Sequence, residues 1–444
     1  MNAVSGGAPV VQHHTPLGVY VLGALAVLAL LLAVASPWLR RRVPNVWWAL
    51  CGYPAAAVRV LWTWRQLADL QNLSVPKRPP LAVLGGVVLR GRALKPIKPR
   101  MGFPRWQRGG LVVRVRLHAG QTPEAYAAAC ESMAHAWQMF AVRAVSDARG
   151  SVSLRASAWD PLTVPFVPFV GSAGVLSAVV GLWEDGARWL IDLRRVPHWL
   201  IVGATRSGKS TLVAALVSQL ARQKVALVGI DLKGGMELSL FEDRLSALAT
   251  TRGEAADLLG KLVEVALSRM ALCREAGARS IWELPEKGRP VPVVVLVDEV
   301  AELYLMASNS DKAEVTQVST ALLRLGQLGA ALGIHLLIAG QRVGSDLGPG
   351  VTALRAQLAG RVCFRVSDKG TAEMALGDLD REALDAVQEI SDDTPGVAVA
   401  FGAAGGSWMR ARSQLVTPEE AQRVAKRYGY LAPAFAELEA GGAS

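Results

Sequence analysis

The chain has 444 residues, 51% of them hydrophobic, and carries a formal net charge of +11. That length allows a membrane anchor followed by two modest domains or one large one. The four cysteines lie far apart without CxxC or Cys/His ligand spacing, which argues against a zinc site or a disulfide scaffold and favours a reducing compartment.

The first predicted element is an apolar stretch without charged residues over residues 17–38. About 20 apolar residues span the hydrocarbon core of a bilayer. An arginine triplet follows at residues 40–42, so the positive-inside rule places residues 1–16 outside and the rest of the chain in the cytoplasm. We therefore expect a single-pass protein of the cell membrane.

A basic membrane-proximal linker is predicted over residues 39–109. Its apolar part, residues 46–64, contains a proline, an arginine and four tryptophans, which favours an interfacial or re-entrant segment, with a second span as the alternative. Residues 1–123 hold 16 basic residues and one acid, Asp69, whereas residues 124–444 hold 32 basic and 36 acidic residues. This basic excess fits anionic lipid heads, nucleic-acid phosphates or simply a solvated linker.

A small α+β domain is predicted over residues 110–180. Residues 111–117 and 151–156 alternate between apolar and polar side chains as strands do, and residues 123–142 between them form a predicted helix. Residues 161–180 show no clean period, and we assign no element there.

The domain predicted over residues 181–415 begins with a candidate phosphate-binding loop. A short apolar strand over residues 199–202 precedes the pattern GxxxxGK[ST], and a predicted helix over residues 212–223 follows it. In such a loop backbone N–H groups surround the phosphates of ATP, and the helix N-terminus adds its dipole. Lys209 is expected to contact the β- and γ-phosphates, and the Ser210 hydroxyl to ligate Mg²⁺. The expected ATP-binding residues are Gly203, Ala204, Thr205, Arg206, Ser207, Gly208, Lys209, Ser210 and Thr211.

A second apolar strand supplies the acids that hydrolysis requires. Residues 293–297 are all apolar and end in Asp298 and Glu299, at the strand end where α/β proteins bind ligands. We expect Asp298 to join Ser210 in holding Mg²⁺ and Glu299 to polarise the attacking water.

Further strands alternate with helices along this region. Predicted strands cover residues 225–230 and 334–339, and predicted helices cover residues 254–276 and 312–332. This alternation predicts a mostly parallel sheet with helices on both faces. Gln341 follows the last of these strands and is a candidate sensor of the γ-phosphate.

Residues 181–403 resemble the motor domain of the FtsK/SpoIIIE DNA translocases. The stretch from Lys233 to Leu238, together with the predicted single anchor, is most similar to the transfer proteins of actinomycete conjugative elements. Five ordered blocks carry the wider resemblance, namely Pro197–Gly203, Ile230–Lys233, Val293–Glu299, Gly333–Arg342 and Arg361–Lys369.

The resemblance implies a RecA-like P-loop NTPase that assembles into a homo-oligomeric, hexameric ring around double-stranded DNA. Such a ring needs an arginine finger that reaches the neighbouring subunit's ATP, and block position favours Arg361 over Arg324, Arg342 and Lys369. The implied DNA-gripping loops are Gly344–Thr352 and Gly234–Glu237, with Arg355 as a further phosphate contact.

The C-terminal part, residues 416–444, is predicted to hold one helix over 418–428 and a tail. It is too short for the winged helix of many family members, so the choice of DNA sequence is left to a separate partner or is absent. The expected function is a membrane-anchored, ATP-driven pump for double-stranded DNA, serving conjugation or chromosome partitioning. Protein cargo as in type VII secretion, single-stranded DNA cargo, and a membrane scaffold with a regulatory nucleotide site remain as alternatives.

Overall fold

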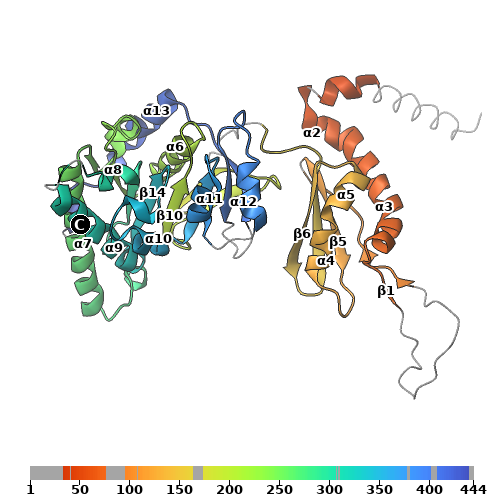
Figure 1. Ribbon diagram of the computed structural model, residues 1–444, viewed down its shortest axis with the longest axis horizontal. Coiled ribbons are helices and arrows are strands. Elements are labelled where there is room, and N and C mark those ends of the chain that lie inside the picture. Colours follow the sequence, from red (N-terminus) through yellow and green to blue (C-terminus); the bar gives the residue numbers. More distant parts are fainter. Residues whose placement is uncertain are drawn as a thin grey trace, which may run out of the picture. The chain divides into compact units, whose positions relative to one another are not determined.

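The computed structural model describes residues 34–40, 42–76, 96–107, 109–163, 174–306, 308, 311–377, 381–401 and 408–439. The chain divides into two compact units, Met1–Asp160 and Pro161–Ser444 (Figure 1). The predicted boundary between the small domain and the larger one, at residue 181, falls inside the first strand of the second unit.

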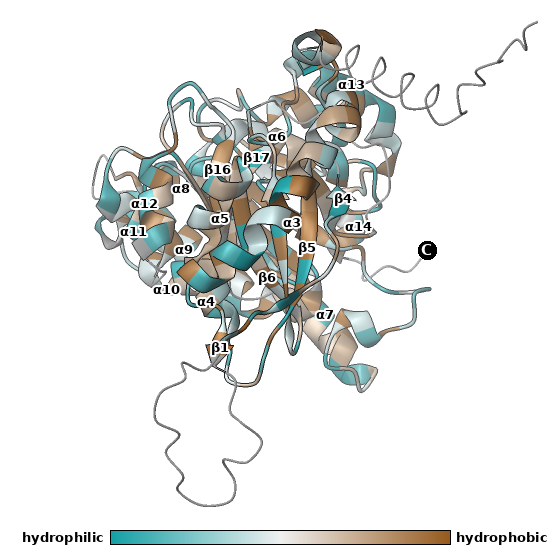
Figure 2. Cartoon of the chain, turned by 90° about the vertical axis from the view of Figure 1, so that its right-hand side faces the viewer, coloured by the Kyte–Doolittle hydropathy of each residue, from teal (hydrophilic) through white to brown (hydrophobic). Residues whose placement is uncertain are grey.

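The first unit is built on a five-stranded antiparallel sheet of order β3-β5-β7-β6, with β4 also paired to β5. Figure 2 shows α3 and α5 in front of β5 and β6. The strands of this sheet are β3 Arg100–Met101, β4 Arg105–Gln107, β5 Gly110–Arg116, β6 Ala141–Ala148 and β7 Ser151–Ser157; β1 Val75–Pro76 pairs with β2 Pro96–Ile97. The helices are α2 Pro44–Trp47, a π-helical turn Trp48–Gly52, α3 Tyr53–Leu70, α4 Pro123–Ala128 and α5 Cys130–Trp137.

One face of this sheet packs against α3, α4 and α5. Alternate residues of β5 and β7, such as Val113 and Leu154, are fully buried there with Val60 of α3 and Tyr126 of α4. The predicted helix over 123–142 is interrupted after Ala128 and ends at Trp137. Gln138 adopts the left-handed conformation at φ +54°, which stops the helix before strand β6.

One face of the apolar stretch at residues 46–64 belongs to this core. The stretch covers the end of α2, the π-helical turn and the first two thirds of α3. Trp48 and Trp64 are 2% and 4% exposed, whereas Trp62 is 88% exposed. The indole nitrogens of Trp48 and Trp64 donate hydrogen bonds to the carbonyl oxygens of Gly110 and Pro99, at 2.9 and 3.1 Å. Packing against a sheet therefore accounts for Trp48 and Trp64, and the interfacial role expected for residues 46–64 stays a prediction.

The predicted single-pass localisation in the cell membrane is contradicted. Among the described residues, no helix combines the length and the apolar character needed to cross a bilayer. Residues 1–16, and residues 17–33 of the predicted span, lie outside the described residues. The remaining residues of that span, 34–38, do not form a helix of membrane-spanning length by themselves.

The second unit is built on a ten-stranded sheet of order β12-β11-β13-β14-β10-β15-β16-β17-β8-β9. The six strands from β12 to β15 are parallel, whereas every pairing from β15 to β9 is antiparallel. The expected mostly parallel sheet is therefore a mixed one. Its strands are β8 Ser177–Trp183, β9 Arg188–Asp192, β10 His198–Val202, β11 Ala226–Ile230, β12 Ala247–Ala249, β13 Val293–Val297, β14 Ile334–Gly340, β15 Gly360–Phe364, β16 Val397–Phe401 and β17 Trp408–Ser413.

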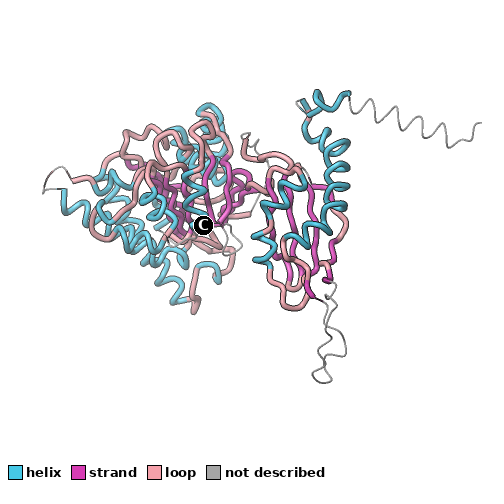
Figure 3. The backbone as a smooth tube through the Cα atoms, turned by 45° about the vertical axis from the view of Figure 1, so that its right-hand side comes forward, coloured by secondary structure: helices cyan, strands magenta, loops and turns pink. Residues whose placement is uncertain are grey.

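Helices cover both faces of this sheet because its central strands are apolar on both sides. Alternate side chains of β13 enter different cores: Val295 packs with α7 and α9, whereas Leu296 packs with α6 and α13. In Figure 3 the strands of this unit run through its middle with helices around them. The helices are α6 Lys209–Leu220, α7 Arg252–Glu275, α8 Val300–Tyr304, α9 Lys312–Leu332, α10 Val351–Gln357, α11 Lys369–Leu376, α12 Arg381–Gln388, α13 Pro418–Tyr428 and α14 Phe435–Glu439.

Candidate nucleotide-binding site

The phosphate-binding loop joins the buried strand β10 to α6. Gly208, which caps α6, has φ +110°, and a Cβ atom there would lie 2.3 Å from the backbone nitrogen of Gly396. A side chain at Gly203 would collide with the side chains of Ser207 and Phe364. The Gly396 N–H in turn donates to the Ser207 carbonyl at 2.8 Å. Both glycines of the motif are therefore required by close packing around the loop.

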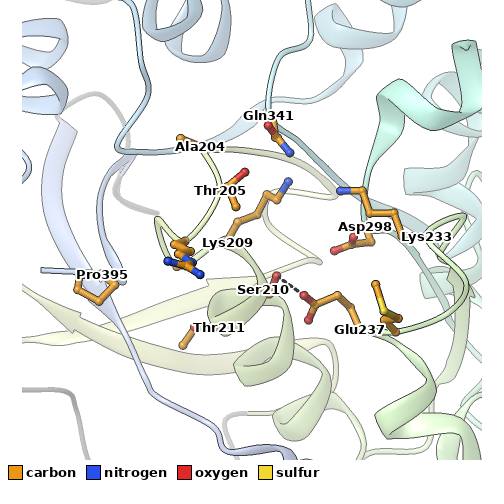
Figure 4. Close-up of a pocket in the computed structure, with 13 residues that line it drawn as sticks. Ala204, Thr205, Lys209, Ser210, Thr211, Lys233, Glu237, Asp298, Gln341 and Pro395 are labelled. Carbon is orange, nitrogen blue, oxygen red and sulfur yellow. Dashed lines mark hydrogen bonds between the residues drawn. The ribbon is translucent and has the colours of Figure 1, made fainter. Parts of the chain in front are cut away.

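A cavity of about 340 Å³ lies at this loop (Figure 4). The residues lining it that the sequence analysis predicted are Ala204, Thr205, Arg206, Gly208, Lys209, Ser210, Thr211, Asp298 and Gln341. The remaining lining residues, which it did not assign to the site, are Lys233, Met236, Glu237 and Pro395. Two other predicted residues, Gly203 and Ser207, lie within the loop, and Glu299 forms an ion pair with Lys209.

Glu299 is the centre of a buried charge cluster. Its Oε2 atom lies 3.1 Å from Lys209 Nζ and 3.3 Å from Lys233 Nζ. Its Oε1 atom accepts a hydrogen bond of 3.1 Å from the backbone N–H of Gln341. Glu299 and Lys209 are 6% and 8% exposed, and a buried carboxylate is tolerated only when paired and hydrogen-bonded in this way. The carboxyl ends of β13, β10 and β14 thus bring the predicted Lys209, Glu299 and Gln341 together.

A tight loop after β11 positions Lys233 and Glu237. Asp231 is fully buried, and its carboxylate accepts hydrogen bonds from the backbone N–H groups of Lys233, Glu237 and Leu238 at 2.9–3.2 Å. Gly234 and Gly235 both have positive φ values, which permits this turn. Glu237 Oε1 accepts a hydrogen bond of 3.1 Å from Ser210 Oγ.

This geometry bears on the stretch Gly234–Glu237, which was predicted as a DNA-gripping loop. Met236 and Glu237 line the nucleotide cavity, and the contact of this stretch with DNA stays a prediction. The sequence did contain a pattern that could have predicted this place in the site. Asp231, Lys233 and two glycines directly follow an apolar strand, and ligands of α/β proteins bind at such strand ends.

Asp298 provides an oxygen suited to a metal ion. It is 4% exposed, and among the described residues its Oδ1 atom has no hydrogen-bond partner. Burial raises the pKa of Asp298 to about 6, with Lys209 opposing and Asp231 and Glu237 reinforcing the rise. The described residues contain no cluster of three or more His, Cys, Asp or Glu that forms a complete metal cage, but Mg²⁺ bound to nucleotide phosphates needs only one or two protein ligands. The donor set of Asp298 and Ser210 fits that ion.

The raised pKa of Asp298 predicts a pH-dependent stability. A carboxyl group whose pKa rises on folding stabilises the native state below its unfolded value, 3.8, and this contribution is lost as the pH rises through 6. Between pH 4 and 7 the free energy of unfolding of the nucleotide-free protein should fall by about 2 kcal/mol more than that of Asp298→Asn. Urea unfolding at several pH values measures this difference. Asp257→Asn, at an exposed position of α7, should follow the wild type; parallel curves for Asp298→Asn and the wild type would contradict the assignment.

The predicted arginine finger, Arg361, and the alternatives to it do not line the nucleotide cavity. The guanidinium of Arg361 donates to the backbone carbonyls of Arg355 and Ala375 at 2.6 and 3.2 Å, which ties α10 and α11 to β15. Arg342 and Lys369 form exposed ion pairs with Asp346 and Asp385. The finger role of Arg361 concerns a neighbouring subunit and stays a prediction.

Known proteins match the sequence of both units. Residues 30–158 match the actinomycete conjugal transfer protein N-terminal domain, and residues 175–289 and 282–345 match the FtsK/SpoIIIE family. The chain is 40% identical over 394 residues to the transfer protein TraSA of Streptomyces ambofaciens, covering 86% of this chain and 94% of that protein. It is also 34% identical over 230 residues to the DNA translocase FtsK of Listeria monocytogenes, covering 46% of this chain and 29% of that protein.

A solved structure shares the fold. The conjugation coupling protein TcpA of pCW3, in its monomer form with ATPγS, superposes with a TM-score of 0.54 at 19% identity, over 84% of this chain and 99% of that one. The α/β fold of the chain is therefore shared with a solved protein, and the assignment of the nucleotide site to Gly203–Thr211 stays a prediction. On the strength of the match to TraSA, which extends over both units, the chain belongs to the FtsK/SpoIIIE family, among the transfer proteins of actinomycetes.

Proposed function

We propose that this protein hydrolyses ATP and couples hydrolysis to the movement of double-stranded DNA during conjugative transfer. The observation that carries the proposal is the buried arrangement of Lys209, Glu299 and Asp298 at neighbouring strand ends beside the phosphate-binding loop. A nucleotide site that served regulation alone would not need a buried carboxylate held in place as a general base.

The contacts suggest how the site works. The phosphates of ATP compete with Glu299 for Lys209, because one ammonium group cannot form close ion pairs with both the carboxylate and the phosphates. Lys233 and the Gln341 N–H keep Glu299 in place once Lys209 has turned to the phosphates. Glu299 is then free to accept a proton from the attacking water. Mg²⁺, held by Ser210 and Asp298, would neutralise charge on the phosphate oxygens.

The names of the relatives support the proposed cargo, and the proposed assembly rests on the resemblance to the FtsK/SpoIIIE motors. The names of the FtsK and TraSA proteins assign them DNA translocation and transfer. We extend these roles to this chain, with a ring of identical subunits, proposed as a hexamer, as the working form. Arg361 would complete each neighbouring site, and Gly344–Thr352, which follows Gln341 in the chain, would contact DNA.

The test is ATP hydrolysis by the full chain with duplex DNA, with single-stranded DNA and without DNA. We expect duplex DNA to raise the rate several-fold and to support displacement of a third strand from a triplex at the end of the duplex. Activation by single strands alone would show a different cargo. A hydrolysis rate that no nucleic acid changes would contradict the coupling of ATP hydrolysis to DNA movement. A rate near zero under all conditions would favour a scaffold with a regulatory nucleotide site.

A further inference from the structure

The sheet face of the first unit opposite its helices is unusually basic. We define the arginine face as Arg100, Arg105, Arg114, Arg116 and Arg149, which line one hollow of about 960 Å³ with Met101, Gly102, Phe103, Val112, Ala148, Gly150, Ser151 and Ser153. All five arginines are exposed. The lining includes no aspartate or glutamate.

Strand register explains why these arginines gather. Arg116 of β5 lies opposite Arg100 of β3 and Ser151 of β7, and Arg114 lies opposite Ser153. Val113 and Val115, the intervening residues of β5, point into the helical core. Since neighbouring strands lie about 4.8 Å apart and alternate residues share a face, the arginines form a compact positive array.

No described acidic residue of this unit neutralises the charges of the array. Among the described residues, Arg100, Arg105, Arg116 and Arg149 form no ion pair, and Arg114 donates one hydrogen bond, to Ser151 Oγ at 3.3 Å. The sequence contains no acid between Asp69 and Glu124. Five like charges repel one another unless a polyanion occupies the face, so the array indicates a binding surface rather than a structural ion-pair network.

We propose that the arginine face binds the phosphate backbone of double-stranded DNA, as a second contact outside the ATPase unit. Arginine binds phosphate through a planar, bidentate fork. A hollow of this size can receive the phosphate ridge of one strand of a duplex, whereas a flat bilayer surface would contact only its rim. Phe103, 68% exposed, is the one aromatic residue of the hollow, which is too few for the row of stacked bases that single-strand binding uses. The proposal rests on the proposed function, because it assigns the same cargo.

The test uses the full chain and the double variant Arg116→Gln/Arg149→Gln. Both positions are exposed, and glutamine keeps a polar side chain of similar reach, so folding should be retained, as a thermal melt would verify. The matched control is Arg65→Gln/Arg195→Gln, which removes two exposed arginines, one on α3 and one after β9. Fluorescence anisotropy of a labelled 30-base-pair duplex without nucleotide gives the affinity across a series of salt concentrations.

Each phosphate contact contributes about 0.9 to the slope of log affinity against log salt. We expect the test variant to lower that slope by about 2 and to weaken duplex binding at 0.1 M salt on the order of 10- to 100-fold. The control should match the wild type, and DNA-independent ATP hydrolysis should be the same in all three proteins.

The other outcomes separate this inference from the proposed function. If all three proteins bind duplex with equal slopes, the arginine face is not a DNA contact, although the cargo assignment stands. If the wild type binds no duplex, both fail. If the test variant keeps duplex binding but loses binding to single strands or to phosphatidylserine vesicles, the face has a different occupant and the proposal is overturned.

Discussion

Replacing Glu299 with glutamine is expected to reduce ATP hydrolysis by about 10²- to 10⁴-fold, the range of a lost general base. The amide keeps the shape of the side chain and cannot accept the proton of the attacking water. Nucleotide affinity should be unchanged or higher, because the variant no longer holds Lys209 in an ion pair of 3.1 Å. Steady-state hydrolysis and equilibrium binding of a fluorescent ATP analogue measure the two effects separately.

The matched control is Glu302→Gln, one turn further along in α8, at a half-buried position that does not line the cavity. It should hydrolyse ATP at the wild-type rate. A Glu299→Gln protein that retained more than about a tenth of the activity would show that another group activates the water. A protein that lost binding as strongly as hydrolysis would show that Glu299 is structural.

Lys209→Ala is expected to impair both binding and hydrolysis. Lys209 is buried in the loop that is expected to bind the phosphates, and its ammonium group lines the cavity. A hydrogen bond to a charged group of this kind contributes about 1.5–3 kcal/mol to the free energy of binding. Nucleotide affinity should therefore fall about 10- to 100-fold, and hydrolysis at saturating ATP by a further 10²- to 10³-fold, because the transition state loses the same charge.

Lys224→Ala removes an exposed lysine between α6 and β11 and serves as the control for a lost positive charge. It should be indistinguishable from the wild type in binding and in hydrolysis. Normal hydrolysis by purified Lys209→Ala would mean that the nucleotide site has been assigned to the wrong loop. Thermal unfolding of each variant would distinguish loss of function from loss of fold.

The parts of the site that could be predicted are those that depend on a short stretch of chain. A strand, a glycine-rich turn and a helix N-terminus are adjacent in sequence, so Gly203–Thr211 could be recognised directly. Asp298 and Glu299 follow an uninterrupted apolar strand. Parallel strands end at the same edge of a sheet, which is why Lys209 and Glu299, 90 residues apart, could be expected to meet.

The parts that could not be predicted depend on contacts without a local pattern. Pro395 lines the cavity from a loop far along the chain, and nothing in its surroundings resembles a nucleotide site. The apolar composition of residues 46–64 fits a bilayer and a protein core equally well, and only the sheet that contains β5 and β7 shows which of these side chains are buried. The antiparallel half of the large sheet was missed because no strand was predicted at β8, β9, β16 or β17, which lie on both sides of the parallel strands along the chain.

The contact between Gly208 and Gly396 also has a consequence for biosynthesis. The phosphate-binding loop leaves the ribosome about 190 residues before the segment that braces it, which at 5–20 residues per second is a delay of about 10–40 s. Gly396 is fixed in turn by β17, since its carbonyl accepts the Ser413 N–H at 2.8 Å. A nascent chain can therefore display the complete motif while lacking the backbone that holds it in shape. The ability to bind nucleotide should appear late in synthesis, when the last strand of the sheet is added.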